Sequence, residues 1–276
     1  MRVMLNLAIS IAIAYLAVLL LVYLFQPRLV YFPQVERELA LTPRSAGLDF
    51  EDVSLLTADG VALHGWWVPA RNARGAALVL HGNAGNISHR IGYLTMFNRL
   101  GYSVLLVDYR GYGKSGGHPG EEGTYRDAEA AWQYLIAVRK LKPDEIAIMG
   151  ESLGGGVATW LALKYPSRAL VLASTFTSVP DLGAQVYPWL PVRLLASIRY
   201  DNLERIRQVA APVLIAHSRS DDIIPFTHGE ALFAAAREPK QLLVLSGGHN
   251  DGFLYMREEW IAAVGVFLER TAAKGK

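Results

Sequence analysis

Ser152 lies in the pattern Gly150-Glu151-Ser152-Leu153-Gly154, between an apolar run of β-strand composition and an apolar helical segment. A serine at a sharp strand-to-helix turn is exposed, and the helix amino terminus favours negative charge that develops beside its hydroxyl. Its neighbours must be small, because the helix has to approach the strand closely. The pattern therefore predicts Ser152 as a nucleophile.

A serine hydroxyl is a weak nucleophile at neutral pH, so it needs a histidine base that a carboxylate orients. Among seven histidines, His249 lies in a glycine-rich loop between the last strand-like run and the C-terminal helical segment. Asp221 follows the preceding strand-like run, and Asp222 is the alternative one residue further on. Serine, acid and histidine in this chain order are typical of one class of hydrolase. We predict Ser152, Asp221 and His249 as a catalytic triad.

The oxyanion of a tetrahedral acyl-transfer intermediate must be stabilised by two N–H groups. The backbone N–H of Leu153, directly after the nucleophile, is the first predicted donor. The second is expected in the loop His81-Gly82-Asn83-Ala84-Gly85-Asn86, whose glycines let the backbone approach a substrate. We assign this second donor to Asn83, with Ala84 as the alternative, and expect His81 to support the loop.

Short strand-like runs that alternate with helical patterns must position these residues. The first two runs flank Asp59-Gly60, which is a hairpin turn signal. The alternation that follows predicts an eight-stranded, mostly parallel sheet with helices on both faces. The strands are expected at Val53–Thr57, Val61–Val68, Ala76–His81, Ser103–Asp108, Glu145–Met149, Ala169–Ala173, Val213–His217 and Leu242–Leu245. Helices are expected near Ser88–Leu100, Thr124–Leu141, Leu153–Tyr165, Asn202–Val209, Thr227–Ala236 and Asp251–Arg270.

Residues 3–25 form a strongly apolar segment in which only Asn6 and Ser10 are clearly polar. As a helix it would be roughly 34 Å long, enough to cross the hydrocarbon core of a membrane. A signal peptide would have a shorter apolar region and a small-residue cleavage site, whereas this segment ends in Phe25-Gln26-Pro27-Arg28. We predict an uncleaved transmembrane anchor.

The mean hydropathy of the chain, +0.21, agrees with such an anchor. The hydropathy of residues 3–25 sums to roughly +58, which accounts for the excess of the whole chain, so the remainder averages near zero. We divide the chain into the anchor at 1–27, an interfacial linker at 28–49 and a catalytic domain at 50–276. Basic side chains follow the apolar segment more often than they precede it, which favours a cytoplasmic catalytic domain.

Composition excludes several other classes of function. The net charge of +2 gives no field that would attract nucleic acid, and the absence of cysteine excludes disulfides, thiolate metal sites and cysteine nucleophiles. The histidines lack metal-ligand spacing, so we expect neither a metal nor another cofactor. The segment Val179–Tyr200 is read either as a lid or acyl-chain wall, or as irregular helices over the sheet edge. Its apolar residues Tyr187, Trp189 and Leu190 are the candidate substrate pocket.

Across residues 50–270 these motifs resemble the α/β-hydrolase superfamily. Together with Asp108-Tyr109-Arg110-Gly111-Tyr112-Gly113-Lys114-Ser115, they are similar to a branch of membrane-associated α/β-hydrolase-domain proteins. That branch includes protein depalmitoylases and is grouped with serine aminopeptidase-type sequences. The depalmitoylases attach to membranes through palmitoylated cysteines, which this chain lacks.

The resemblance implies the α/β-hydrolase fold and a serine hydrolase mechanism. We therefore expect a membrane-anchored enzyme that cleaves carboxylic esters or thioesters, with an acyl-chain substrate. One alternative is a serine peptidase of the aminopeptidase-like group, for which the single acid of the segment 179–200, Asp181, offers little support. The other is a catalytically silent membrane scaffold with a hydrolase fold.

Overall fold

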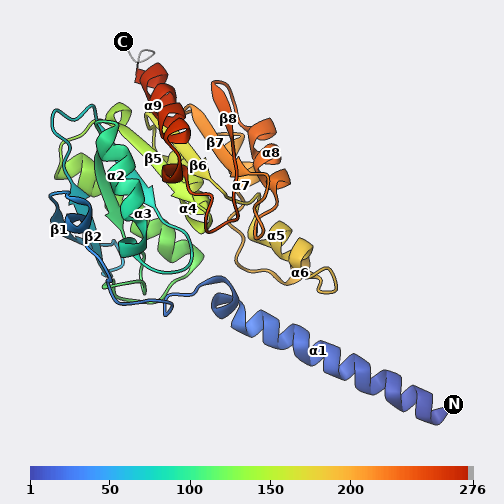
Figure 1. Ribbon diagram of the computed structural model, residues 1–276. Helices are drawn as coiled ribbons and strands as arrows, with labels where there is room; N and C mark the ends of the chain where they lie inside the picture. Colours follow the sequence, from blue (N-terminus) through green and yellow to red (C-terminus); the bar gives the residue numbers. More distant parts are fainter. Residues whose placement is uncertain (273–276) are drawn as a thin grey trace.

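The computed structural model describes residues 1–272 and places eight strands in one sheet, in the order β1-β2-β4-β3-β5-β6-β7-β8 (Figure 1). β1 and β2 form the expected antiparallel hairpin, β2 also runs antiparallel to β4, and all other neighbours are parallel. Every strand begins and ends within two residues of its predicted position, which confirms the predicted fold class. The strands are Glu51–Leu56, Ala62–Val68, Ala76–Leu80, Ser103–Val107, Ile146–Glu151, Ala169–Ala173, Val213–Ser218 and Lys240–Leu245 for β1 to β8.

Helices cover both faces of the sheet, because five of its central strands are buried along their whole length and expose no polar face. One face packs against α2 (Ile91–Arg99) and α9 (Glu258–Ala272). The other face packs against α3 (Glu121–Ala137), α4 (Leu153–Lys164), α7 (Asn202–Ile206) and α8 (Phe226–Ala235). The last helix begins seven residues later than the sequence predicts. Gly247, at φ +100°, and a turn closed by Gly252 N–H and the Gly248 carbonyl, at 2.9 Å, keep that stretch in a loop.

The segment Val179–Tyr200 contains two short helices, α5 (Val179–Val186) and α6 (Val192–Leu195). They lie beside the point where the N-terminal helix α1 (Arg2–Val30) leaves the domain (Figure 1). We call residues 179–198 the cap.

Helix α1 is long and apolar enough to cross a membrane, and its most apolar 18-residue window is not buried by the rest of the protein. It continues through Pro27 to Val30, further than the predicted anchor. Pro27 has no N–H to donate to the Tyr23 carbonyl four residues back. The Gln26 side chain donates to that carbonyl at 3.2 Å instead, so the helix continues without an orphaned carbonyl.

Tyr31, directly after α1, is buried in the domain, with only 3% of its surface exposed. Its hydroxyl lies 2.9 Å from the Tyr200 hydroxyl, which in turn lies 2.8 Å from Thr124 Oγ1. From its sequence position, Tyr31 is predicted to lie in the interfacial linker. For Tyr31 the structure shows packing against the core instead, because its hydroxyl finds partners there.

Candidate active site

The turn between β5 and α4 holds Ser152 in a backbone conformation that few non-glycine residues adopt, φ +51° and ψ −117°. Strain of this kind persists only where the surroundings enforce it. The Ser152 N–H donates to the Ala173 carbonyl at 2.9 Å, and Thr175 Oγ1 donates to the Ser152 carbonyl at 2.7 Å. A Cβ on Gly154 would lie 2.0 Å from the Leu80 carbonyl oxygen, so only glycine lets α4 approach β3 here.

The structure brings Ser152, His249 and Asp221 into one chain of hydrogen-bonding atoms. The Ser152 Oγ lies 3.1 Å from His249 Nε2, and His249 Nδ1 lies 2.9 Å from Asp221 Oδ2. When Nδ1 carries the proton, its N–H donates a hydrogen bond to Asp221. Nε2 then has a free lone pair that can accept a hydrogen bond from the Ser152 hydroxyl. The three side chains follow the carboxyl ends of β5, β7 and β8, which are parallel and end on the same side of the sheet, with β6 between β5 and β7.

Asp221 is held as an ionised acceptor. Its Oδ1 accepts the backbone N–H groups of Ile223 at 3.0 Å and Ile224 at 2.8 Å. Burial by itself would raise the pKa of Asp221, but His217, His249 and the Ile224 N–H outweigh it and keep this pKa well below its ordinary value. A carboxylate that remains ionised can orient the imidazole and stabilise the imidazolium.

Asp222, the alternative acid in the sequence, faces a different atom. Its Oδ1 accepts the backbone N–H of His249 at 2.8 Å, and no contact with the imidazole ring is seen among the described residues. Asp221 thus holds the ring of His249, while Asp222 holds its backbone.

The predicted oxyanion loop passes directly beside Ser152. A Cβ built on Gly82 would lie 3.4 Å from the Ser152 Cβ and 2.8 Å from Glu151 Oε1, so glycine is required for this approach. The Asn83 side chain is occupied in fixing the loop. Its Oδ1 accepts the Phe32 N–H at 3.1 Å and the Tyr112 hydroxyl at 2.8 Å.

Two further polar contacts support the site, and the sequence does not identify the partner in either of them. Glu151, which is buried next to the nucleophile, pairs with Arg90 Nε at 3.2 Å. The buried Asn86 side chain donates to three consecutive carbonyls of the linker, Glu36 at 2.6 Å, Arg37 at 3.2 Å and Glu38 at 2.9 Å. Both join segments far apart in the chain, so residue spacing could not reveal them.

Comparison with known proteins identifies the family to which this fold belongs. Residues 77–197 match the family model described as alpha/beta hydrolase fold. The uncharacterized protein Rv2307c of Mycobacterium tuberculosis is 43% identical over 96% of this chain and 95% of its own length. The Arabidopsis thaliana alpha/beta hydrolase domain-containing protein WAV2 is 33% identical over 90% of this chain and 89% of its own. The chain belongs to the α/β-hydrolase fold family.

Solved structures show that the resemblance extends to the whole fold. This α/β-hydrolase superposes on the Pyrococcus furiosus esterase Pf2001 with a TM-score of 0.70 at 24% identity, covering 83% of this chain and 94% of the esterase. The esterase domain of a Rhodothermus marinus protein gives a TM-score of 0.61 at 21% identity, covering 82% and 99% of the two chains. The conserved feature at this level of identity is the fold.

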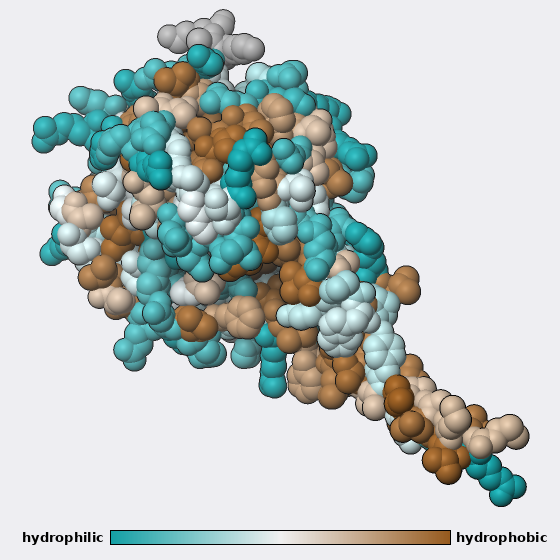
Figure 2. Space-filling view, turned by 45° about the vertical axis from the view of Figure 1, so that its right-hand side comes forward, coloured by the Kyte–Doolittle hydropathy of each residue, from teal (hydrophilic) through white to brown (hydrophobic). Residues whose placement is uncertain are grey.

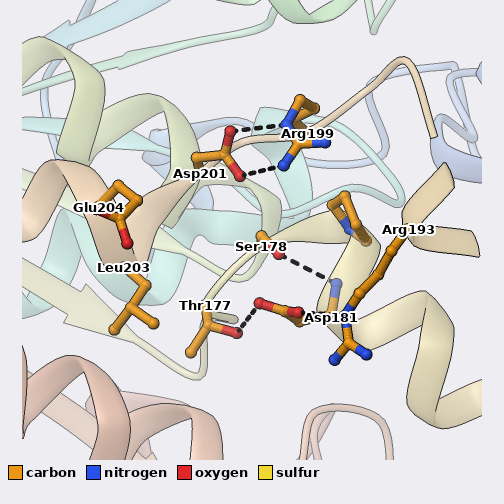
Figure 3. Close-up of a pocket in the computed structure, with 9 residues that line it drawn as sticks. Thr177, Ser178, Asp181, Arg193, Arg199, Asp201, Leu203 and Glu204 are labelled. Carbon is orange, nitrogen blue, oxygen red and sulfur yellow. Dashed lines mark hydrogen bonds and ion pairs between the residues drawn. The ribbon is translucent and has the colours of Figure 1, made fainter.

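The three candidate pocket residues of this α/β-hydrolase, all in the cap, differ in their exposure to solvent. Tyr187 and Trp189 are largely exposed, whereas Leu190 is buried. A cavity of about 210 Å³ lies at the base of the cap, and none of the three lines it in the described structure. Its walls carry two ion pairs, Arg193 with Asp181 and Arg199 with Asp201 (Figure 3). The α/β-hydrolase has no group of three or more metal-binding side chains within residues 1–272.

At the start of the predicted oxyanion loop, His81 forms a fully buried pair with Asp108, with His81 Nε2 3.6 Å from Asp108 Oδ1. Burial raises the pKa of Asp108 to about 7, although the Ile87 N–H donates to it at 3.0 Å. Burial also lowers the pKa of His81 to about 3. Between about pH 3 and pH 7 both side chains are therefore neutral, which avoids an isolated buried charge.

We expect the buried Asp108 to make the stability of the fold depend on pH. The folded protein holds this proton more tightly than the unfolded chain, so the favourable contribution is present at low pH. It is lost as the pH rises from about 4 towards 7. Asp108→Asn removes the ionisation and keeps an acceptor for the Ile87 N–H. Urea unfolding in detergent should show the variant gaining stability relative to wild type by roughly 1–4 kcal/mol between pH 4 and 8. Parallel pH profiles for the two proteins would contradict this assignment.

Proposed function

We propose that the protein is a membrane-anchored serine hydrolase that cleaves carboxylic esters or thioesters through an acyl-enzyme. The observation that carries the proposal is the continuous chain from Ser152 Oγ through His249 to Asp221, with distances of 3.1 Å and 2.9 Å. A nucleophile, a base and an orienting carboxylate at these distances can carry out acyl transfer.

In the proposed reaction, His249 Nε2 takes the Ser152 proton as Oγ attacks the acyl carbon. The imidazolium then returns this proton to the leaving oxygen or sulfur, and the acyl group remains on Oγ as an ester. Water, deprotonated by the same histidine, attacks this ester and releases the carboxylic acid and free Ser152. Asp221 stays ionised throughout and stabilises the imidazolium.

The oxyanion is proposed to lie between the backbone N–H groups of Leu153 and Asn83. Leu153 begins α4, and the first N–H groups of a helix have no carbonyl partner within it. The approach of Gly82 to Ser152 and the two hydrogen bonds that fix Asn83 support a second donor at Asn83. Donors that a fold already holds in place stabilise an oxyanion most strongly, because they need no reorganisation during the reaction.

The anchor assignment is supported by how α1 meets the domain. Gln26, the buried residue of α1, donates to the Leu195 carbonyl at 2.9 Å and accepts the Ser197 N–H at 2.8 Å. Removing α1 as a signal sequence would remove these hydrogen bonds between the helix and the cap. We therefore propose a retained helix, with the catalytic domain on the cytoplasmic side as the flanking arginines favour.

Esters and thioesters are favoured over peptides. An aminopeptidase needs unpaired acidic groups to hold the substrate amine, but Asp181 and Asp201 at the base of the cap are each paired with an arginine, Arg193 at 3.1 Å and Arg199 at 2.8 Å. Solved structures of similar fold include proteins named esterases. The depalmitoylase-like branch falls within this proposal as a thioesterase.

A panel of acyl substrates on the detergent-extracted protein tests the proposal. We expect hydrolysis of p-nitrophenyl esters and acyl thioesters, with kcat/KM rising from acetyl to long acyl chains by roughly threefold or more per added pair of CH₂ groups until the pocket is full. A fluorophosphonate probe should label the folded protein. Activity that does not change with chain length would contradict the acyl preference, and a folded protein that resists the probe would favour the silent scaffold.

A further inference from the structure

The cap lies alongside the apolar helix α1 rather than above its end. The Tyr15 hydroxyl donates to the Trp189 carbonyl at 2.9 Å, and Gln26 is bonded to Leu195 and Ser197. Tyr15 is near the middle of α1, so the cap follows the helix over more than ten residues. In Figure 2 apolar side chains gather where the base of α1 meets the domain, and the apolar surface continues along the helix.

This position conflicts with a cap that is wholly in water. The part of α1 before Tyr15 is residues 2–14, which as a helix is roughly 20 Å long. A membrane hydrocarbon core is about 30 Å thick and needs about 20 residues. A spanning α1 must therefore continue past Tyr15 towards the domain, and the residues bonded to it at that level must enter the bilayer with it.

The composition of the cap tip, residues 186–195, suits a lipid environment. Four of its apolar side chains are exposed by half or more: Val186 by 52%, Tyr187 by 50%, Trp189 by 59% and Leu194 by 88%. Arg193 is the one charged residue between 182 and 198, and its long side chain reaches back to Asp181 at the base of the cap. Exposed apolar patches bordered by charge are typical of membrane contact.

The same end of α1 leads directly to the active site. Phe32, two residues after Val30, forms a bridge with Ala84 and donates its N–H to Asn83, both in the proposed oxyanion loop. Tyr200, two residues after the cap, packs against α4, since a Cβ on Gly156 would lie 2.6 Å from its ring. The membrane helix, the cap and the oxyanion loop thus meet on one side of the domain.

We propose that the cap tip is immersed in the bilayer leaflet that receives α1, and that the active site takes its acyl substrate from this lipid phase rather than from water. This inference rests on the proposed anchor and the proposed hydrolase activity. It restricts the substrate class to acyl esters or thioesters that reside in a membrane. Tyr187 and Trp189 then contact lipid, consistent with their exposure in the structure.

Because the chain has no cysteine, single cysteines can report membrane depth without background. The full-length protein carrying Leu194→Cys, Leu16→Cys or Leu56→Cys would be labelled with an environment-sensitive dye and reconstituted into phosphatidylcholine vesicles that contain spin-labelled lipid. All three leucines are exposed, on the cap, on α1 and on β1. We expect a blue shift and quenching for the dye at Leu194 comparable with the dye at Leu16, and neither effect at Leu56.

Quenching at Leu16 without quenching at Leu194 would overturn cap immersion and leave the anchor intact. Absence of quenching at Leu16 would show that α1 does not enter the membrane. The inference would then also be overturned, because it requires this insertion. Fluorophosphonate labelling of Ser152 in the same vesicles tests the hydrolase proposal independently. Failure of cap immersion can therefore be distinguished from failure of the proposed hydrolase activity.

A second measurement tests where the substrate comes from. Leu194→Glu places a charge in the proposed lipid contact, and Leu56→Glu is the matched control. We expect Leu194→Glu to lower kcat/KM for a long-chain ester embedded in vesicles by roughly tenfold, with unchanged activity on a soluble acetyl ester. Equal losses on both substrates, or no loss on either, would contradict uptake from the bilayer.

Discussion

Replacing Ser152 by alanine is expected to lower kcat for ester hydrolysis by about 10⁶-fold and to abolish fluorophosphonate labelling. The variant loses only the hydroxyl that would attack the acyl carbon. The alanine keeps the Cβ, so the strained backbone at φ +51° and the bonds to Ala173 and Thr175 should persist. Residual turnover would come from the oxyanion donors and from substrate binding.

Ser54→Ala, at an exposed position on β1, is the matched control and should retain full activity and labelling. Circular dichroism of both variants checks that the fold is preserved. A Ser152→Ala protein that still hydrolyses esters, or still reacts with the probe, would show that the proposed nucleophile is wrong.

The second large effect is expected from the acid. Asp221→Asn should lower kcat by about 10⁴-fold, because the Asn amide can donate to His249 Nδ1 and so favours the imidazole tautomer that carries its proton on Nε2. That tautomer cannot accept the Ser152 hydroxyl. The variant also lacks the negative charge that stabilises the imidazolium.

Asp222→Asn provides a nearly isosteric comparison one residue away. Its amide oxygen can still accept the His249 N–H that Asp222 accepts at 2.8 Å, so we expect a loss of about tenfold or less. Steady-state kinetics on one ester substrate measures both variants. If Asp222→Asn has the larger effect, the assignment of the two acids must be reversed.

Local patterns were sufficient to predict the sheet and the positions of Ser152, Asp221 and His249. Each of the three residues follows a strand whose apolar run is visible in the sequence, and parallel strands bring their carboxyl ends to one edge. The glycines around Ser152 mark close contacts that the structure confirms, such as Gly154 against the Leu80 carbonyl.

Local sequence patterns could not predict the side-chain contacts that support the candidate site and the sheet. No role is predicted for His217 from the sequence, yet its Nε2 lies 2.8 Å from the Ile224 carbonyl and 3.5 Å from Asp221 Oδ2, so it supports the acid. A histidine four residues before the acid, at the end of the same strand, was the available signal. His64 pairs with Asp52 on the neighbouring strand at 2.7 Å, and this contact depends on the register between the two strands, which residue spacing alone does not reveal.

The short connection after α1 also limits where the enzyme can work. Only Tyr31 separates the last helical residue, Val30, from Phe32, which is already bonded to the oxyanion loop. A one-residue connection is too short to act as a flexible linker. The domain is therefore held close to the end of α1 and cannot extend away from it. With α1 as the proposed anchor, the proposed hydrolase would find its substrates by diffusion in the plane of the membrane, and an acyl group held far above the bilayer surface would stay beyond its range.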